Sequence, residues 1–359
     1  MRVGVSCESL STRNLVGIGN TTLNLIQRCR VLFPNDEMVP IAKTEKFDRF
    51  HNTEIVNPPV PKSFYQSYLS LTAKHLNVDI LHNSCGWLNM VKPTVPSVVT
   101  LYDLIPFTHP QYLTPPMRIY WKLCARRNLE LADHIVSISQ ASKDVAVQQC
   151  GIPEEKITVV YPGVDERFRQ VDETTIIDLY KLLPHRYVLF VGSIDPRKNI
   201  PLIIRTMKKV APDVPLVIAS GGGWMTEDVE RASQECGNVR FLGYVPDRIL
   251  PALYSHALML VWPSVVEGFG LPPLEAMACG CPVITSNCSS LPEVVGDAAL
   301  TINPGDSDQL SEAIAILMGD RGLRHELGRR GLIRAKQFTW DRFATGVHAA
   351  YEQVAECVS

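Results

Sequence analysis

Two glutamates, Glu267 and Glu275, lie eight positions apart in the stretch EGFGLPPLEAMACGCP (267–282). The apolar run LMLVWPS (258–264) before them predicts a buried strand, and Pro272 and Pro273 favour the first turn of a following helix. The turn between strand and helix would present backbone N–H groups where the positive end of the helix dipole favours phosphate. We therefore predict anion contacts from Gly268, Phe269, Gly270 and Leu271.

The two carboxylates suit a ligand that carries sugar hydroxyls. Glu275, predicted in the first turn of the helix, offers two acceptor oxygens that can take both hydroxyls of a ribose cis-diol. Glu267, at the end of the strand, would face the other side of the same pocket. The plain alternative is that both glutamates only complement the helix dipole, an effect of about 0.3–1 kcal/mol each.

A pair of adjacent cations follows another predicted strand. In FVGSIDPRKNI (190–200) the strand ends near Ser193, which is a further donor-binding candidate. A loop that contains Arg197 and Lys198 follows. Arginine offers a planar fork of donors and lysine a point charge, so the pair could neutralise a diphosphate beside a small-residue turn. The alternative is a solvated pair on a loop.

The first half of the chain contributes further candidates. Gly17 and Gly19 precede a helical pattern, where glycine lets the backbone approach a ligand closely, although a plain loop is the alternative. Asp103 follows the run VVTLY and could bind or position an acceptor, with loop capping as its alternative. Tyr102 and His82 are candidate sugar or acceptor contacts, and a structural role is the alternative for His82.

These residues need a fold that presents the ends of strands. Short apolar runs alternate with helical stretches in both halves of the chain, which predicts parallel sheets covered by helices. We therefore predict an α/β protein with two doubly wound, Rossmann-like domains facing a central cleft. The expected domains are 1–168, which binds the acceptor, and 169–335, which binds the donor, with 336–359 as a closing helix that could pack back on the first domain.

Composition narrows the class of protein. The 359 residues carry a net charge of −2, which disfavours nucleic acid as a partner, and no apolar run is long enough to cross a membrane. The N-terminus reads as a strand rather than a signal peptide, so we expect a cytoplasmic protein. The pair Cys279 and Cys281 lacks the further ligands of a metal site, so we expect reduced cysteines and no bound metal.

The run PSVVEGFGLPPLEAMACGCPVITSNCSSLPEVVGDAAL resembles the donor-binding segment of the retaining, nucleotide-sugar-dependent glycosyltransferases of family 4, which have the GT-B fold. Their mark is a glutamate, seven residues and a second glutamate, and the resemblance extends over nearly the whole chain. It implies that Arg197 and Lys198 bind the donor diphosphate. It also implies that the glycine loop closes over the phosphates and that the backbone at Tyr244 and Val245 receives the nucleobase.

One segment departs from the family pattern. Relatives commonly carry a His-Asp pair after the strand that ends near residue 101, where this chain has Tyr102 and Asp103. A phenol can donate and accept a hydrogen bond, but near neutral pH it does not readily shuttle protons. The departure puts the histidine contact with the transferred sugar in doubt, but it does not affect the prediction of the fold.

The resemblance implies transfer of a hexose from a nucleotide-diphosphate sugar to a saccharide or lipid-linked acceptor, with retention of anomeric configuration. The segments GIGNTTLNL, YDLIPFTHP and GWMTEDV resemble mannosyltransferases, which favours GDP-mannose; a UDP-hexose or a GDP-deoxyhexose comes second. Because no Asp-x-Asp motif accompanies the donor segment, we expect neither metal nor cofactor. A phosphorylase and a non-catalytic sugar-nucleotide-binding protein are the competing hypotheses.

A basic segment suggests one further partner. In MRIYWKLCARR (117–127), Arg118, Lys122 and Arg126 recur at helical spacing beside Tyr120 and Trp121. Such a helix could rest on an anionic membrane surface, since many relatives act on lipid-linked acceptors; a solvated face is the ordinary alternative.

Overall fold

The computed structural model describes residues 1–10, 17–42, 54–55, 65–84, 92–223 and 227–356. The chain divides into two compact units. Unit 1 combines Met1–Gly163 with Thr339–Ser359, and unit 2 is Val164–Phe338. The first crossing thus falls at 163/164 instead of the expected 168/169, and the return falls at 338/339 instead of 335/336.

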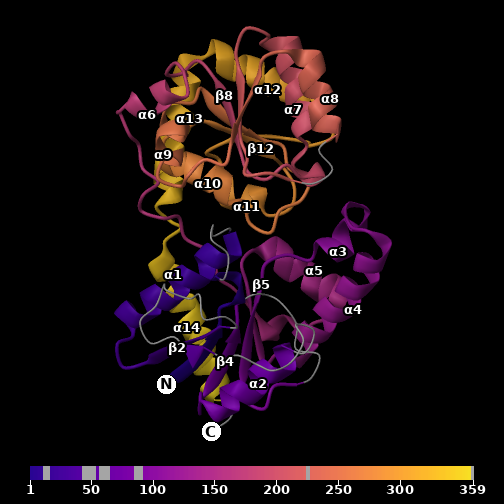
Figure 1. Cartoon of the computed structure of the whole chain (residues 1–359), viewed down its shortest axis with the longest axis vertical. Helices are drawn as coiled ribbons and strands as arrows, with labels where there is room; N and C mark the ends of the chain where they lie inside the picture. The colour runs from indigo at the N-terminus through magenta and orange to yellow at the C-terminus, as the bar shows by residue number, and fades with distance from the viewer. Residues whose placement is uncertain (11–16, 43–53, 56–64, 85–91, 224–226, 357–359) are drawn as a thin grey trace. The chain divides into compact units, whose positions relative to one another are not determined.

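Unit 1 is built on a seven-stranded parallel sheet in the order β3-β2-β1-β4-β5-β6-β7 (Figure 1). Its strands are β1 (Arg2–Ser6), β2 (Glu37–Ala42), β3 (Glu54–Ile55), β4 (Ile80–Asn83), β5 (Ser97–Leu101), β6 (His134–Ser137) and β7 (Ile157–Val159). Its helices are α1 (Gly17–Leu32), α2 (Tyr65–His75), α3 (Ile105–Thr108), α4 (Pro115–Leu131), α5 (Gln140–Cys150) and α14 (Trp340–Glu356), with short 3-10 turns at Glu8–Leu10, Pro110–Tyr112 and Glu154–Lys156.

Unit 2 repeats the plan with a six-stranded parallel sheet in the order β10-β9-β8-β11-β12-β13. Its strands are β8 (Val188–Val191), β9 (Leu216–Ala219), β10 (Val239–Gly243), β11 (Met259–Trp262), β12 (Val283–Ser286) and β13 (Leu300–Ile302). Its helices are α6 (Thr175–Leu179), α7 (Ile200–Val210), α8 (Glu227–Cys236), α9 (Leu250–Ser255), α10 (Leu271–Ala278), α11 (Leu291–Val295), α12 (Ser307–Gly319) and α13 (Arg321–Ala335), with a 3-10 turn, η5, at Pro196–Lys198.

The predicted class, two doubly wound α/β domains, is confirmed. Continuous apolar runs became strands buried along their whole length, such as β8 and β11, because parallel strands are covered on both faces. Sequence reasoning missed β3 and β13, which contain two and three residues. Runs this short carry too few apolar positions to show a pattern.

The C-terminal helix α14 belongs to unit 1, where it lies beside α1 (Figure 1). Its buried residues recur at helical spacing and include Phe343, Val347 and Tyr351. His348 stacks on Phe33 at the end of α1, with ring centroids 3.6 Å apart, and its Nε2 lies 2.6 Å from a carboxylate oxygen of Asp36. The chain thus returns to complete its first unit.

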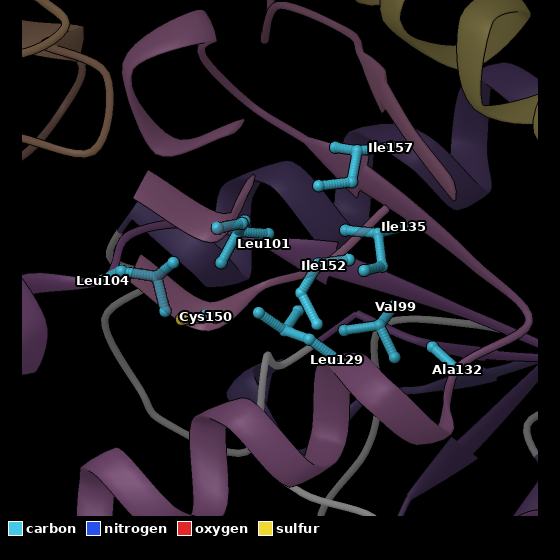
Figure 2. Close-up of a cluster of buried hydrophobic side chains, with 10 residues drawn as sticks. Val99, Leu101, Leu104, Leu129, Ala132, Ile135, Cys150, Ile152 and Ile157 are labelled. Atoms are coloured by element: carbon cyan, nitrogen blue, oxygen red, sulfur yellow. The ribbon is translucent and has the colours of Figure 1, made fainter. Parts of the chain in front are cut away.

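An apolar cluster in unit 1 packs α4 and α5 against the sheet. Figure 2 shows Leu129 of α4 in the same cluster as Val99 of β5, Ile135 of β6 and Ile152. All four are buried. One side of α4 is therefore buried in the core of unit 1.

Candidate donor site in unit 2

The predicted phosphate and sugar residues follow β8 and β11, which are neighbours at the centre of the sheet in unit 2. The chain runs from β8 outward through β9 and β10, and then returns to the other side of β8 with β11. The order of strands therefore reverses between β8 and β11. Ligands of open α/β sheets bind beyond the carboxyl ends of the strands at such a point.

Arg197 is held by a buried carboxylate that sequence reasoning did not single out. Asp195 caps η5 through the amide of Arg197, and its Oδ2 lies 2.7 Å from Arg197 Nη2 and 3.0 Å from Nε. Burial by itself would raise the pKa of Asp195, but the hydrogen bonds and charge of Arg197 outweigh it and lower that pKa. The signal was present in the sequence, because an aspartate two residues before the arginine is a common helix cap.

Lys198 is the last residue of η5, in the loop that follows β8. Its Nζ is 3.3 Å from Ser193 Oγ and 4.7 Å from the ring centroid of Trp262. A Cβ on Gly192, whose φ is +150°, would come within 2.8 Å of both Lys198 Nζ and the Trp262 ring, so this position requires glycine. Burial lowers the pKa of Lys198, while the charge of Glu267 opposes that shift.

Two loops that follow different strands are joined directly. Val265 N–H donates to the carbonyl oxygen of Arg197 over 2.8 Å, and Arg197 Nη1 donates to the carbonyl oxygen of Val266 over 3.3 Å. Ser264 Oγ in turn donates to Glu267 Oε1 over 2.8 Å. The structure thus brings the Arg197–Lys198 pair next to Glu267, although 69 residues separate Arg197 from Val266.

The turn that begins at Glu267 is braced by two serines before α11. Ser289 Oγ donates to the carbonyl oxygen of Glu267 over 2.7 Å and accepts from its amide over 3.2 Å. Ser290 Oγ donates to the carbonyl oxygen of Phe269 over 2.7 Å. Sequence reasoning missed both serines, because their partners lie more than 20 residues earlier and serine is common in loops.

Gly270 is the N-cap of α10, with φ of +118°, and Pro272 stands in the first turn as expected. The expectation that Glu275 lies in the first turn is wrong. Because α10 begins at Leu271, Glu275 is its fifth residue, and the first turn holds no acidic side chain. For Glu275, a role in complementing the helix dipole is correspondingly weak, since that effect falls off within the first turn.

Glu275 has an unusual electrostatic environment. Tyr254 Oη of α9 donates to its Oε2 over 3.0 Å. Removal of the carboxyl from water raises the pKa of Glu275 to about 8. The hydrogen bond from Tyr254 and the charge of Arg167 oppose this rise, and Asp247 and Asp165 add to it.

The nucleobase candidates follow β10. Gly243 ends that strand with φ of +69°, Tyr244 is 51% exposed and Val245 is buried. Position 221 lies against the Tyr244 side chain, since a Cβ there would be 3.3 Å from the ring. In the sheet, β9 lies between β10 and β8.

The candidates of unit 1 lie at strand ends and a helix start. Gly17 and Gly19 stand in the first turn of α1, while residues 11–16 before them fall outside the described part of the chain. Tyr102 Oη donates to the carbonyl oxygen of Ser84 over 2.9 Å. Asp103 is exposed, and its Oδ1 accepts from the amide of Ile105 over 3.2 Å, which is the capping contact that the sequence left open.

His82 lies in the core of unit 1. Its Nδ1 is 2.5 Å from Tyr351 Oη of α14, and its Nε2 is 2.7 Å from Thr100 Oγ1. The ring is fully buried, and this burial lowers the pKa of His82 to about 3. A neutral imidazole with both nitrogens engaged favours the structural role over contact with a sugar or an acceptor.

Within the described ranges, no three His, Cys, Asp or Glu side chains converge as metal ligands, and no helix is long and apolar enough to span a membrane. Cys279 and Cys281 are buried free thiols, and burial raises the pKa of Cys281 to about 12. Both lie at the end of α10 and the start of β12, where they pack in the core of unit 2.

Comparisons with known proteins agree with the fold. Residues 177–333 match the family of glycosyl transferases group 1, and residues 25–168 match glycosyltransferase family 4. The O-antigen chain mannosyltransferase B of Escherichia coli is 35% identical over 267 residues, which cover 71% of this chain and 70% of that protein. The chain belongs to the family 4 glycosyltransferases with the GT-B fold, as the sequence motifs indicated.

Two further proteins extend the comparison. The serotype-specific mannosyltransferase WbdA of Escherichia coli is 31% identical over 271 residues, covering 71% of this chain but only 33% of WbdA. The crystal structure of Anabaena HepE in complex with UDP and glucose superimposes with a TM-score of 0.78 at 18% identity, covering 98% of this chain and 100% of HepE. That similarity concerns the fold.

Proposed function

We propose that this glycosyltransferase moves mannose from GDP-mannose to a saccharide or lipid-linked saccharide, with retention of anomeric configuration and without a metal ion. The observation that carries the proposal is the bonding between the Arg197 and Val265–Val266 loops, which sets two cations beside Glu267. The choice of mannose is supported by the two Escherichia coli relatives, both of which are named as mannosyltransferases.

The two cations would stabilise the negative charge that develops on the leaving group during the reaction. When the bond between the anomeric carbon and the phosphate oxygen breaks, its electron pair leaves with the nucleoside diphosphate. Arg197, Lys198 and the amides of Gly268, Phe269 and Gly270 would stabilise that anion at the start of α10. Asp195 keeps the guanidinium of Arg197 in a fixed orientation.

We assign Glu267 to the hydroxyls of the donor sugar and Glu275 to those of the ribose. Neither the sequence nor the described part of the site offers an obvious nucleophile on the sugar side, which favours attack on the face that the diphosphate leaves. The acceptor oxygen would bond to the anomeric carbon, and its proton would pass to an oxygen of the departing phosphate. Double displacement is the other route to retention.

A donor panel tests the proposal. Calorimetry with GDP, UDP and inorganic phosphate, followed by transfer assays with each sugar nucleotide, should give tightest binding of GDP and turnover of GDP-mannose. If only a UDP-hexose or only a GDP-deoxyhexose is turned over, that nucleotide sugar is the donor in place of GDP-mannose. Phosphate-dependent product would indicate a phosphorylase, and nucleotide binding without turnover on any acceptor would indicate a binding protein.

Two measurements on the same reaction test its stereochemistry and metal dependence. Proton NMR of the product should show the anomeric configuration of the donor. Activity should survive dialysis against EDTA, because the two cations perform the role that a divalent ion would otherwise take. Inverted product, or activity that returns only with added metal, would contradict those parts of the proposal.

We also propose that the enzyme works in the cytoplasm at the inner face of a membrane. The support is the exposed face of α4, which carries both basic and apolar side chains.

A further inference from the structure

The two adjacent cations of the candidate site are held in different ways. Arg197 is paired with the carboxylate of Asp195 over 2.7 Å. Among the residues that the structure describes, no carboxylate forms an ion pair with the ammonium of Lys198. Its Nζ instead donates to Ser193 Oγ over 3.3 Å and lies 4.7 Å from the ring centroid of Trp262. Lys198 is therefore held by a hydroxyl and an aromatic ring, both of which are neutral.

Trp262, the last residue of β11, is fixed by the packing around it. Its side chain is 1% exposed, and its ring stacks on that of Phe190 in β8, with centroids 4.8 Å apart and planes at 15°. Gly192 leaves room for the lysine beside the ring, since a Cβ there would come within 2.8 Å of both side chains. The ring thus offers the ammonium a surface in a defined position.

No hydrogen bond explains why position 262 carries tryptophan. Trp262 Nε1 is buried, and it meets no hydrogen-bond partner in the described part of the chain. A buried donor without a partner lowers stability, whereas a phenylalanine or leucine would pack there without that cost. What tryptophan adds is the aromatic face that attracts a cation most strongly. The contact with Lys198 therefore accounts for the indole.

We propose that Trp262 is a positioning residue of the transfer reaction, because its ring holds the ammonium of Lys198 at the site of the donor diphosphate without neutralising it. Ser193 engages one N–H of the ammonium, and the others can turn to phosphate oxygens. A carboxylate in place of the ring would compete with the phosphate for those donors. The inference rests on the proposed function, since it takes the ligand of Lys198 to be a nucleoside diphosphate.

The test is calorimetry with GDP on the full chain, arranged as a double-mutant cycle between positions 198 and 262. K198M should weaken GDP binding by about tenfold or more, because a charge-assisted bond to phosphate is lost. W262L should weaken it by about 3- to 30-fold, and W262F by about threefold, since a phenyl ring attracts a cation less strongly than an indole. In the K198M background, W262L should change the affinity by less than about twofold, because the ring then has no cation to hold.

Trp340 provides the matched control. It is a buried tryptophan of unit 1 that packs on Phe343 with ring centroids 5.6 Å apart, and its Nε1 likewise meets no partner among the described residues. W340L should keep the dissociation constant for GDP within about twofold of the wild type. Circular dichroism shows whether each variant folds. If W262L does not, W262F takes its place in the cycle with K198M.

The cycle separates a failure of this inference from a failure of the proposed function. If the losses caused by W262L and K198M multiply in the double variant, Trp262 acts only by packing, and the inference is wrong while the role of Lys198 stands. Unchanged GDP binding by both W262L and W262F would overturn it equally. If K198M itself binds GDP as the wild type does, Lys198 does not contact the diphosphate, and its proposed role is wrong together with the inference.

Discussion

Glu275, to which we assign the ribose hydroxyls, has a pKa well above that of an ordinary glutamate. An ionised carboxylate accepts two ribose hydroxyls best, because both of its oxygens are acceptors, yet its desolvated setting raises its pKa to about 8. Below that pH, most free enzyme carries a protonated Glu275, so binding through the ionised form releases a proton. The residue therefore links nucleotide affinity to pH.

We expect the affinity for GDP-mannose to rise by up to about tenfold per pH unit between pH 6 and 7.5, and to level off near pH 8. Isothermal titration at several pH values, in buffers of different ionisation enthalpy, measures both the slope and the proton release. Glu275→Gln should bind more weakly and lose this dependence. A flat profile in the wild type would mean that Glu275 binds the ribose as a neutral acid or does not bind it.

In the proposed mechanism Asp195 is a positioning residue, because it would act through Arg197. Asp195→Asn keeps the shape of the side chain but removes the charge that aligns the guanidinium over 2.7 Å. We expect kcat to fall by about one to two orders of magnitude, since small displacements of a group that stabilises charge are costly. Asp308→Asn, which alters an exposed partner of Lys209, is the matched control and should be neutral. Equal kinetics for the two variants would contradict the proposal that Asp195 positions Arg197 for the reaction.

At the scale of elements, α10 depends on the backbone conformation of its first residues. Gly270 has φ of +118°, and a Cβ there would come within 2.8 Å of Leu291 in α11. The start of α10 is therefore held between a strained turn and a neighbouring helix, and the amides that would face the phosphates depend on both.

Gly270→Ala should lower the free energy of unfolding by about 1–3 kcal/mol and also weaken binding of GDP, because the turn must move. Denaturant titration and calorimetry measure the two effects. Gly319→Ala, in a position where a Cβ meets nothing within 4 Å, should leave both within experimental error. Loss of stability with unchanged GDP affinity would show that the amides of this turn do not contact the ligand.

At the scale of the whole chain, the last helix completes the first unit. Buried residues of α14 contact α1 and strands β4, β5 and β6, which are distant in sequence. Unit 1 is therefore built from two stretches of chain that lie on either side of unit 2 in the sequence, and its core includes side chains of α14.

Phe343→Ala should lower the free energy of unfolding by about 3–5 kcal/mol, because Phe343 is fully buried. Hydrogen exchange should quicken in β4, β5 and β6 before it does in β8 and β11. Gln353→Ala on the exposed side of α14 is the control and should change stability by less than about 0.5 kcal/mol. Faster exchange in unit 2 first would contradict the assignment of α14 to unit 1.

The sequence by itself determined the class of fold and the main candidates for chemistry. Apolar runs that alternate with helical periods predict doubly wound sheets, because a strand covered on both faces needs no polar alternation. The E-x7-E segment, its glycines and its prolines are local signals, since turn conformation and helix start depend on neighbours in the chain. The Arg197–Lys198 pair and its place after a strand could be read in the same way.

Only the tertiary structure decided which of these residues meet and in what state. The bonds of Ser289 to Glu267, of Tyr254 to Glu275 and of His82 to Tyr351 join positions separated by 22, 21 and 269 residues. The raised pKa of Glu275 comes from desolvation, and desolvation depends on what packs around a group rather than on the residues beside it in the chain. For the same reason, the exposed side of α4 became recognisable once burial of Leu129 had shown which side of that helix the core uses.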